Sequence, residues 1–183
     1  MHNQDILERL KKGNATYMSA KANPGDVSLE KRKDTTDNGQ HPYAIVVCCS
    51  DSRVIPEAIF SAGIGEIFTI RVAGNVITDT QLGSIQYAAG HLGSKVILVL
   101  GHTNCGAVDA AIHHAPDGFV KTITDEIKKA IGDETDPGAA SCLNVRNSVK
   151  KIEESLGIGQ GESDGLKVCG AIYHIEDGRV EFL

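Results

Sequence analysis

The sequence predicts an α/β fold, with a mainly parallel central sheet flanked by helices and an antiparallel edge strand at the C-terminal end. Short apolar runs rich in β-branched residues alternate with longer segments of helical period, which is typical of a parallel sheet. Near the end of the chain, Asp177-Gly178 separates two apolar segments and indicates a hairpin. A length of 183 residues favours one domain. We therefore expect a single domain over residues 1–183, with residues 1–25 as a helical arm.

The first forty residues are expected to form one helix and a connecting loop. Residues 4–22 carry apolar side chains at three- and four-residue spacings, namely Ile6, Leu7, Leu10, Tyr17 and Met18. The helix should end before Asn23-Pro24-Gly25, since proline and glycine interrupt helices. Residues 26–41 are charged and poor in apolar side chains, so they predict a loop.

The middle of the chain predicts buried strands separated by helices. The continuous apolar run at 43–49 is typical of a strand covered on both faces. Residues 66–72 and the very apolar residues 95–100 predict a second and a third strand. Between the first two, Pro56 suits the first turn of a short helix that ends at Phe60. Residues 79–92 predict a helix with Thr78 as its N-cap.

The last eighty residues continue the same alternation. Helical patterns cover residues 104–113, about 118–131 and 141–156. Residues 166–175 and 180–183 are then expected to form the two strands of the closing hairpin.

Composition excludes several classes of protein. Hydrophobic residues make up 41% and charged residues 23%, which is typical of a globular chain. Apolar runs such as Val96–Leu100 are far shorter than the roughly 20 residues of a membrane helix. The start shows no basic segment followed by an apolar core, so we expect no secretory signal and a cytoplasmic location. A net charge of −6 and the lack of a Lys/Arg cluster argue against nucleic-acid binding.

Five cysteines in a chain without an export signal favour metal binding or a reactive thiol over a disulfide framework. Cys48, Cys142 and Cys169 are interpreted as small core residues. Cys49 and Cys105 differ, because each belongs to a polar cluster that follows a predicted buried strand.

These two clusters are Cys49-Ser50-Asp51-Ser52-Arg53 and His102-Thr103-Asn104-Cys105-Gly106. Ligands of parallel sheets lie outside the carboxyl ends of the strands, and neighbouring strands are only ~4.8 Å apart. Cys49, His102 and Cys105 could therefore meet. Two thiolates and an imidazole suit zinc, and three protein ligands leave a fourth position for water, as in catalytic zinc sites. The sequence thus predicts a zinc site.

Asp51 and Arg53 lie on the same side as Cys49 if the chain stays extended beyond the strand. An arginine beside an aspartate favours the ionised carboxylate. Asp51 could accept a hydrogen bond from the water on the metal, or it could itself bind the metal and close the fourth position. Both alternatives stay open, and the choice depends on whether Arg53 holds Asp51 away.

The two motifs and the strands before them resemble the β-class carbonic anhydrases from about Gln40 to Ala111, with a weaker similarity at Val168–Tyr173. The resemblance implies one Zn²⁺ per chain on Cys49, His102 and Cys105. It also implies a catalytic dyad of Asp51 and Arg53. Three further positions match residues near the substrate of that family, namely Gln40, Tyr87 and Gly106.

The implied activity is the reversible hydration of carbon dioxide to bicarbonate by a metal-bound hydroxide. The resemblance further implies a homodimer, or a higher even-numbered oligomer, with the N-terminal helix packed on the partner and the site near the interface. Docking of that helix within its own chain is equally consistent with its apolar stripe.

Two alternative functions stay open. Val72 stands where many members of the family carry asparagine, in Arg71-Val72-Ala73-Gly74-Asn75, and relatives with similar ligands hydrolyse carbonyl sulfide or carbon disulfide. The second alternative is a non-enzymatic zinc or thiol protein in which Cys48-Cys49 senses redox state. Gly74-Asn75 itself is interpreted as turn chemistry.

Overall fold

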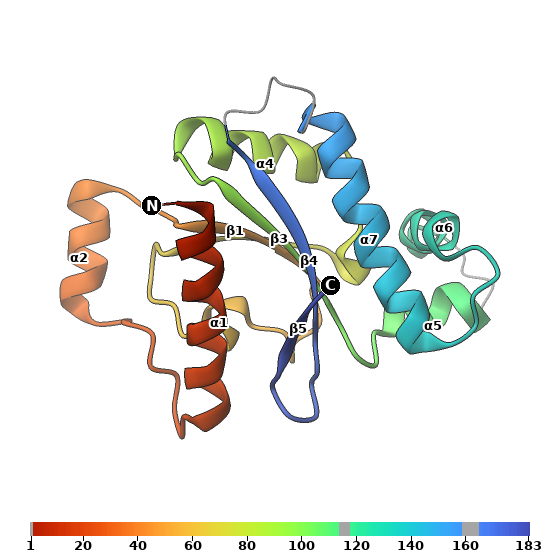
Figure 1. The fold of residues 1–183 in the computed structure, drawn as a ribbon, viewed down its shortest axis with the longest axis horizontal. Coiled ribbons are helices and arrows are strands. Elements are labelled where there is room, and N and C mark those ends of the chain that lie inside the picture. The colour runs from red at the N-terminus through yellow and green to blue at the C-terminus, as the bar shows by residue number, and fades with distance from the viewer. Residues whose placement is uncertain (1, 114–117, 159–164) are drawn as a thin grey trace.

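The structure is a computed structural model that describes residues 2–113, 118–158 and 165–183. Within these ranges the strands form one five-stranded sheet in the order β2-β1-β3-β4-β5 (Figure 1). The strands are β1 (Ala44–Cys48), β2 (Ile67–Arg71), β3 (Val96–His102), β4 (Lys167–Tyr173) and β5 (Val180–Phe182). The first four are parallel, and β5 pairs antiparallel with β4. The predicted fold class is confirmed.

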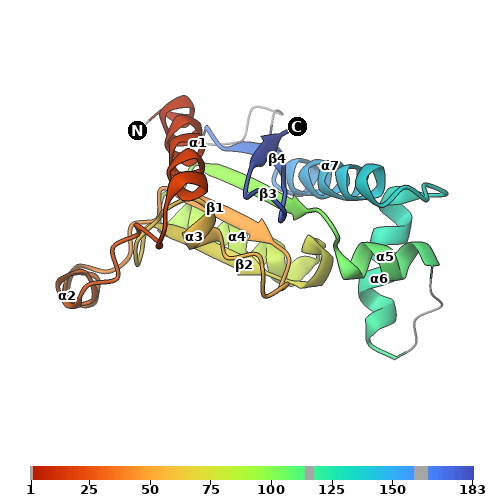
Figure 2. The ribbon, with the colours of Figure 1, turned by 90° about the horizontal axis from the view of Figure 1, so that it is seen from below.

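Helices cover both faces of the sheet (Figures 1 and 2). One face packs against α1 (Asn3–Ser19) and α3 (Pro56–Ile59), and the other against α4 (Asp79–His91) and α7 (Pro137–Ser155). Because side chains alternate along a strand, Val46 and Leu98 enter the first core while Ile45 and Val99 enter the second. Both faces are therefore buried, which explains the continuous apolar runs of the central strands.

Helix α1 docks on its own chain, which is the intramolecular alternative. Its apolar stripe of Ile6, Leu7 and Leu10 is buried in the core against the sheet. Farther along the helix, the buried Asn14 amide donates to the carbonyl oxygens of Ile59 at 3.2 Å and Gly178 at 2.8 Å. These contacts fix α1 to α3 and to the β4–β5 hairpin.

The predicted loop at 26–41 is wrong, because it contains α2 (Leu29–Asn38). Ser28 caps this helix by accepting a hydrogen bond from the backbone N–H of Lys31 at 3.1 Å. No residue of α2 is buried, so the segment has no apolar stripe and its helical period is invisible in the sequence. Helix α2 lies at the opposite end of the molecule from α5 (Gly106–His113) and α6 (Val120–Ile131).

Helix α7 begins four residues before its predicted start at 141, since Asp136 and Pro137 form its beginning. The Asp136 carboxylate accepts from the backbone N–H of Ala139 at 2.7 Å, and proline suits the first helical position. Thr78 caps α4 as predicted, in a reciprocal capping arrangement with Gln81. No helix in the described part of the chain is long and apolar enough to span a membrane.

Candidate metal centre

The centre forms where the strand order reverses. From β1 the chain reaches β2 on one side, whereas β3 lies on the other side of β1. At such a switch point the connections diverge beyond the carboxyl ends of the strands and leave room for a ligand. Cys49 directly follows β1, and His102 is the last residue of β3. Two segments 53 positions apart are thereby brought together, as the sequence predicts.

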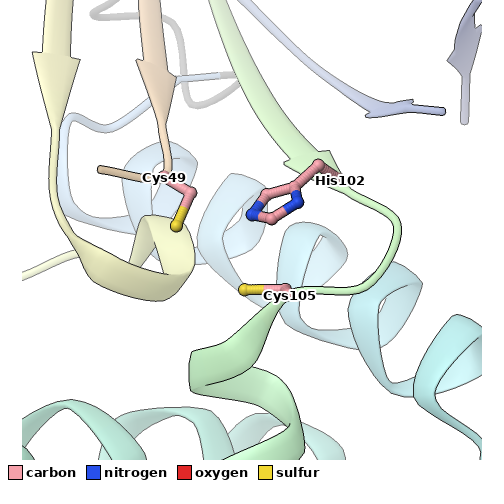
Figure 3. A group of neighbouring side chains, drawn as sticks. All are labelled: Cys49, His102 and Cys105. Atoms are coloured by element: carbon pink, nitrogen blue, oxygen red, sulfur yellow. The ribbon is translucent and has the colours of Figure 1, made fainter. Parts of the chain in front are cut away.

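Cys49, His102 and Cys105 point toward one another from the end of β1, the end of β3 and the start of α5 (Figure 3). One ligand atom from each, the two sulfurs and an imidazole nitrogen, lie within 4.8 Å of one another. All three residues are buried, and η1 (Ala73–Asn75), α5 and α6 pack around them. The three predicted ligands are thus in reach of a single ion.

The imidazole of His102 is prepared for a metal by its backbone partner. Its Nδ1 lies 2.8 Å from the carbonyl oxygen of Thr103, and because that oxygen only accepts, Nδ1 carries the proton. Nε2 is buried and has no hydrogen-bond partner among the described residues, while the whole residue is only 1% exposed. An unpaired buried polar atom costs free energy, so the free lone pair of Nε2 fits a coordinated metal ion.

The thiol groups of Cys49 and Cys105 are linked by a hydrogen bond. The pKa of Cys49 is lowered to about 4, chiefly because the Cys105 thiol donates a hydrogen bond to it. The pKa of Cys105 is raised by the same hydrogen bond and by burial. Cys49 therefore favours the thiolate form that metal ions bind, and a divalent cation would displace the proton of Cys105.

Backbone N–H groups face both sulfurs. Those of Asp51 and Gly74 lie 3.4 Å and 3.3 Å from the Cys49 Sγ. Cys105 immediately precedes α5, and the N–H groups of Ala107 and Val108 favour its thiolate. These donors and the Cys-His-Cys set suit Zn²⁺, which prefers thiolate and imidazole ligands.

Arg53 forms a bidentate ion pair with Asp51 beside the centre. Its Nε and Nη2 donate to the two carboxylate oxygens of Asp51 at 2.9 Å and 2.7 Å. This pairing is the first cause of the lowered pKa of Asp51, so the carboxylate is ionised. Arg53 Nη2 also donates to the carbonyl oxygen of Asn104 at 3.2 Å, which ties the first motif to the second. Of the two open alternatives, the structure shows the one in which Arg53 holds Asp51.

The predicted substrate contacts do not all come together within one chain. Gly106 begins α5 directly after Cys105. Gln40 is exposed and precedes β1, at the opposite end of that strand from Cys49. Tyr87 lies in the second half of α4, 49% exposed, with its ring 6.2 Å from that of Phe68 near the start of β2. Gly106 therefore adjoins the centre, whereas Gln40 and Tyr87 lie at the amino ends of the strands.

Gly74 is a site residue that the sequence analysis interpreted as turn chemistry alone. Its φ of +66° does require glycine, but its N–H also bonds the Cys49 sulfur. A Cβ at this position would lie 2.6 Å from Ile127 Cδ1. The resemblance at Arg71–Asn75 is the sequence signal that could have marked it.

Of the remaining cysteines, Cys48 is a core residue as predicted, whereas Cys142 and Cys169 are partly buried and pack against the core. Cys48 is fully buried on the face of the sheet that packs against α1, and burial raises its pKa to about 12. Burial also raises the pKa of Cys169, to about 11. Cys48 and Cys49 thus face different environments, which argues against a joint redox role.

Comparison with known proteins identifies the family. A family model described as carbonic anhydrase matches residues 44–180. The solved structure of a Coccomyxa β-carbonic anhydrase in complex with acetazolamide has a TM-score of 0.72 and 26% identity, covering 99% of this chain and 82% of that one. The chain belongs to the β-carbonic anhydrase family. Hydration of carbon dioxide is the general reaction of these enzymes.

Two further members of the family are similar to this chain in sequence or in structure. A carbonic anhydrase of Mycolicibacterium smegmatis is 36% identical over 184 residues, which cover 94% of this chain and 89% of that protein. A structure from the fungus Sordaria macrospora, described among two tetrameric β-carbonic anhydrases, has a TM-score of 0.67 and 26% identity. It covers 84% of this chain and 91% of that one.

Proposed function

We propose that this member of the family uses zinc to catalyse the reversible hydration of carbon dioxide to bicarbonate. One Zn²⁺ per chain would be bound by Cys49, His102 and Cys105. The observation that carries the proposal is the buried Nε2 of His102, which has no hydrogen-bond partner among the described residues and lies in a group with the sulfurs of Cys49 and Cys105. Bound zinc supplies the nucleophile at neutral pH, since it lowers the pKa of water to about 7, as is established for zinc enzymes including other carbonic anhydrases.

Asp51 and Arg53 would keep the fourth position open and oriented. Both carboxylate oxygens of Asp51 are bound by the guanidinium of Arg53, which would keep Asp51 from binding the metal as a fourth ligand. An ionised carboxylate only accepts hydrogen bonds. Asp51 would therefore orient a hydrogen-bearing oxygen for attack on the substrate carbon.

The start of α5 would bind the oxygen that gains charge. The first N–H groups of a helix lack partners within the helix and carry partial positive charge. Gly106 supplies the first of these beside Cys105. A donor fixed in advance near developing negative charge lowers the barrier without reorganising during the reaction.

Gln40 and Tyr87 could contact substrate only in the site of a neighbouring copy, because they lie away from the centre of their own chain. We propose a homodimer or a higher even-numbered oligomer on this ground. The description of the Sordaria macrospora enzymes as tetrameric is consistent with an even-numbered oligomer. All five cysteines are free, which fits a reducing compartment, and we propose a cytoplasmic location.

Stopped-flow hydration of carbon dioxide, followed with a pH indicator, tests the proposed reaction. Zinc-loaded protein should accelerate hydration far above the buffer rate, and zinc-loaded protein without measurable hydration would contradict the proposal. Turnover of carbonyl sulfide and carbon disulfide on the same sample separates the hydrolase alternative, which uses the same ligands.

A further inference from the structure

Helix α7 holds the turn that touches the metal centre. Asn144 Nδ2 donates to the carbonyl oxygen of Gly74 at 2.8 Å. One helical turn later, Ser148 Oγ donates to the carbonyl oxygen of Asn75 at 3.2 Å. The two donors lie on one face of α7, because residues four apart share a face of a helix. Two consecutive carbonyl groups of η1 are therefore fixed by a single helix.

The same turn donates to a metal ligand. The Gly74 N–H lies 3.3 Å from the Cys49 sulfur, and Asn75 N–H donates to the Val72 carbonyl at 3.0 Å. Gly74 and Asn75 both have positive φ, +66° and +45°. Asparagine is among the few residues besides glycine that adopt this conformation readily, so the backbone of the turn suits both residues.

Space around the turn is already filled. A Cβ built on Gly74 would lie 2.6 Å from Ile127 Cδ1 of α6 and 3.1 Å from Ala107 Cβ of α5. The side-chain nitrogen Nδ2 of Asn75 has no hydrogen-bond partner among the described residues. The turn is therefore fixed by packing and by the bonds from α7 rather than by the Asn75 side chain.

Asn144 and Ser148 are each only 2% exposed, on a helix face that also buries Val145 and Ile152. Burying polar side chains costs free energy unless they are hydrogen-bonded. Both are satisfied by carbonyl groups of η1 and so fix the Gly74–Asn75 peptide, which directly follows the peptide that carries the Gly74 N–H. Hydrogen bonds to metal ligands orient them and tune their affinity for the metal.

We propose that Asn144 and Ser148 are positioning residues that keep the Gly74 N–H on the Cys49 sulfur and so set the strength of the zinc–thiolate bond. This inference rests on the proposed zinc site. Without Asn144 the Gly74 carbonyl would lose its partner, and the turn would relax away from the sulfur. Loss of such a supporting contact typically weakens metal binding by about 10–100-fold.

Zinc affinity tests the inference, measured by competition with a chromophoric chelator. We expect Asn144→Ala to weaken binding about 10-fold and Ser148→Ala by a smaller factor. Ser141→Ala is the control within α7, because Ser141 is also buried but, among the described residues, its hydroxyl donates only to the Pro137 carbonyl of its own helix. Asn14→Ala is the control for losing a buried asparagine that bonds two carbonyls elsewhere. Both controls should bind zinc as the unaltered protein does.

Cobalt substitution adds a readout that a general loss of stability would not move. Removing an N–H from a thiolate raises the energy of its lone pairs, so the sulfur-to-cobalt charge-transfer band should shift to lower energy in Asn144→Ala. If Asn144→Ala does not fold, Ser148→Ala is compared with its control Ser141→Ala instead. The zinc affinity and the cobalt charge-transfer band of these two variants then test the inference.

Two results would overturn the inference and leave the proposed function standing. In one, Asn144→Ala and Ser148→Ala bind zinc as tightly as the unaltered protein, with the same cobalt spectrum. In the other, Ser141→Ala and Asn14→Ala weaken zinc binding by as much as Asn144→Ala and Ser148→Ala do. If the unaltered protein binds no zinc, both the inference and the proposed function fail.

Discussion

Arg53 binds both carboxylate oxygens of Asp51, at 2.9 Å and 2.7 Å, directly after the strand that supplies the first metal ligand. The same guanidinium reaches the carbonyl oxygen of Asn104, in the segment between His102 and Cys105. The charged dyad and the three ligands are thus parts of one unit. A lysine could not replace this arginine, since it lacks the planar fork that two oxygens require.

Replacing Asp51 should separate metal binding from turnover. Asp51→Ala removes an acceptor next to the centre but none of the three ligands, so the variant should keep one zinc per chain. Its hydration rate should fall by roughly 100-fold, the lower end for a lost catalytic acceptor. Stopped-flow assays and metal analysis on the same sample measure both quantities. Asp37→Ala, on the exposed helix α2, is the control and should stay fully active. Full activity of Asp51→Ala would show that Asp51 and Arg53 take no part in catalysis.

Cys105→Ser should lose zinc, because an alcohol is a poor substitute for a thiolate. Metal content per folded chain, from mass spectrometry and circular dichroism, gives the measurement. Cys142→Ser is the matched control, since Cys142 lies on α7 outside the Cys-His-Cys group and should leave the zinc content unchanged. A stoichiometry of one zinc in Cys105→Ser would show that the ligand assignment is wrong.

Zinc removal should lower the melting temperature. A ligand that binds only the folded state stabilises it, by about 4 kcal/mol at a free concentration 1,000 times its Kd. For a chain of this size that corresponds to about 8–16 °C. Calorimetry before and after chelation measures the shift, and added zinc should restore it while magnesium should not. An unchanged melting temperature in the fully chelated protein would contradict a zinc site built from three buried side chains.

Alkaline pH should weaken folding partly through Tyr43. Burial raises the pKa of this phenol from 10.0 to about 12, with the nearby Arg9 opposing the shift. Between pH 10 and 12 the unfolded chain therefore loses the proton while the folded chain keeps it, so stability falls as pH rises. One proton corresponds to a slope of at most about 1.4 kcal/mol per pH unit.

Tyr43→Phe keeps the ring and removes the titrating group, so its stability should fall less steeply over the same range. Urea unfolding at several alkaline pH values compares the two slopes. Identical slopes would show that Tyr43 does not contribute.

The sheet and the ligands could be predicted because buried strands require apolar residues, which are visible as runs in the sequence. Strands such as Val96–His102 are covered on both faces and therefore read as continuous apolar runs. The ligands follow such runs, and the parallel topology then brings them together. The polar helix α2 has no buried face, so it left no periodic signal.

Other features depend on distances between chain segments that no local pattern records. The hydrogen bond from the Gly74 N–H to the Cys49 sulfur forms only when η1 lies against the end of β1 in the folded chain. The separation of Gln40 from the centre follows from the length and direction of β1, which places it at the far end of the strand. Asn144 and Ser148 look like ordinary polar residues of a helix until the turn beneath them is known.

A diffraction map collected at the zinc absorption edge tests the central claim most directly. We predict one anomalous peak per chain, about 2.3 Å from the sulfurs of Cys49 and Cys105 and about 2.0–2.1 Å from Nε2 of His102. The fourth position should hold a non-protein ligand, with Asp51 still on Arg53. Zinc-soaked crystals without a peak among these three side chains, or with a further protein side chain as permanent fourth ligand, would contradict the account.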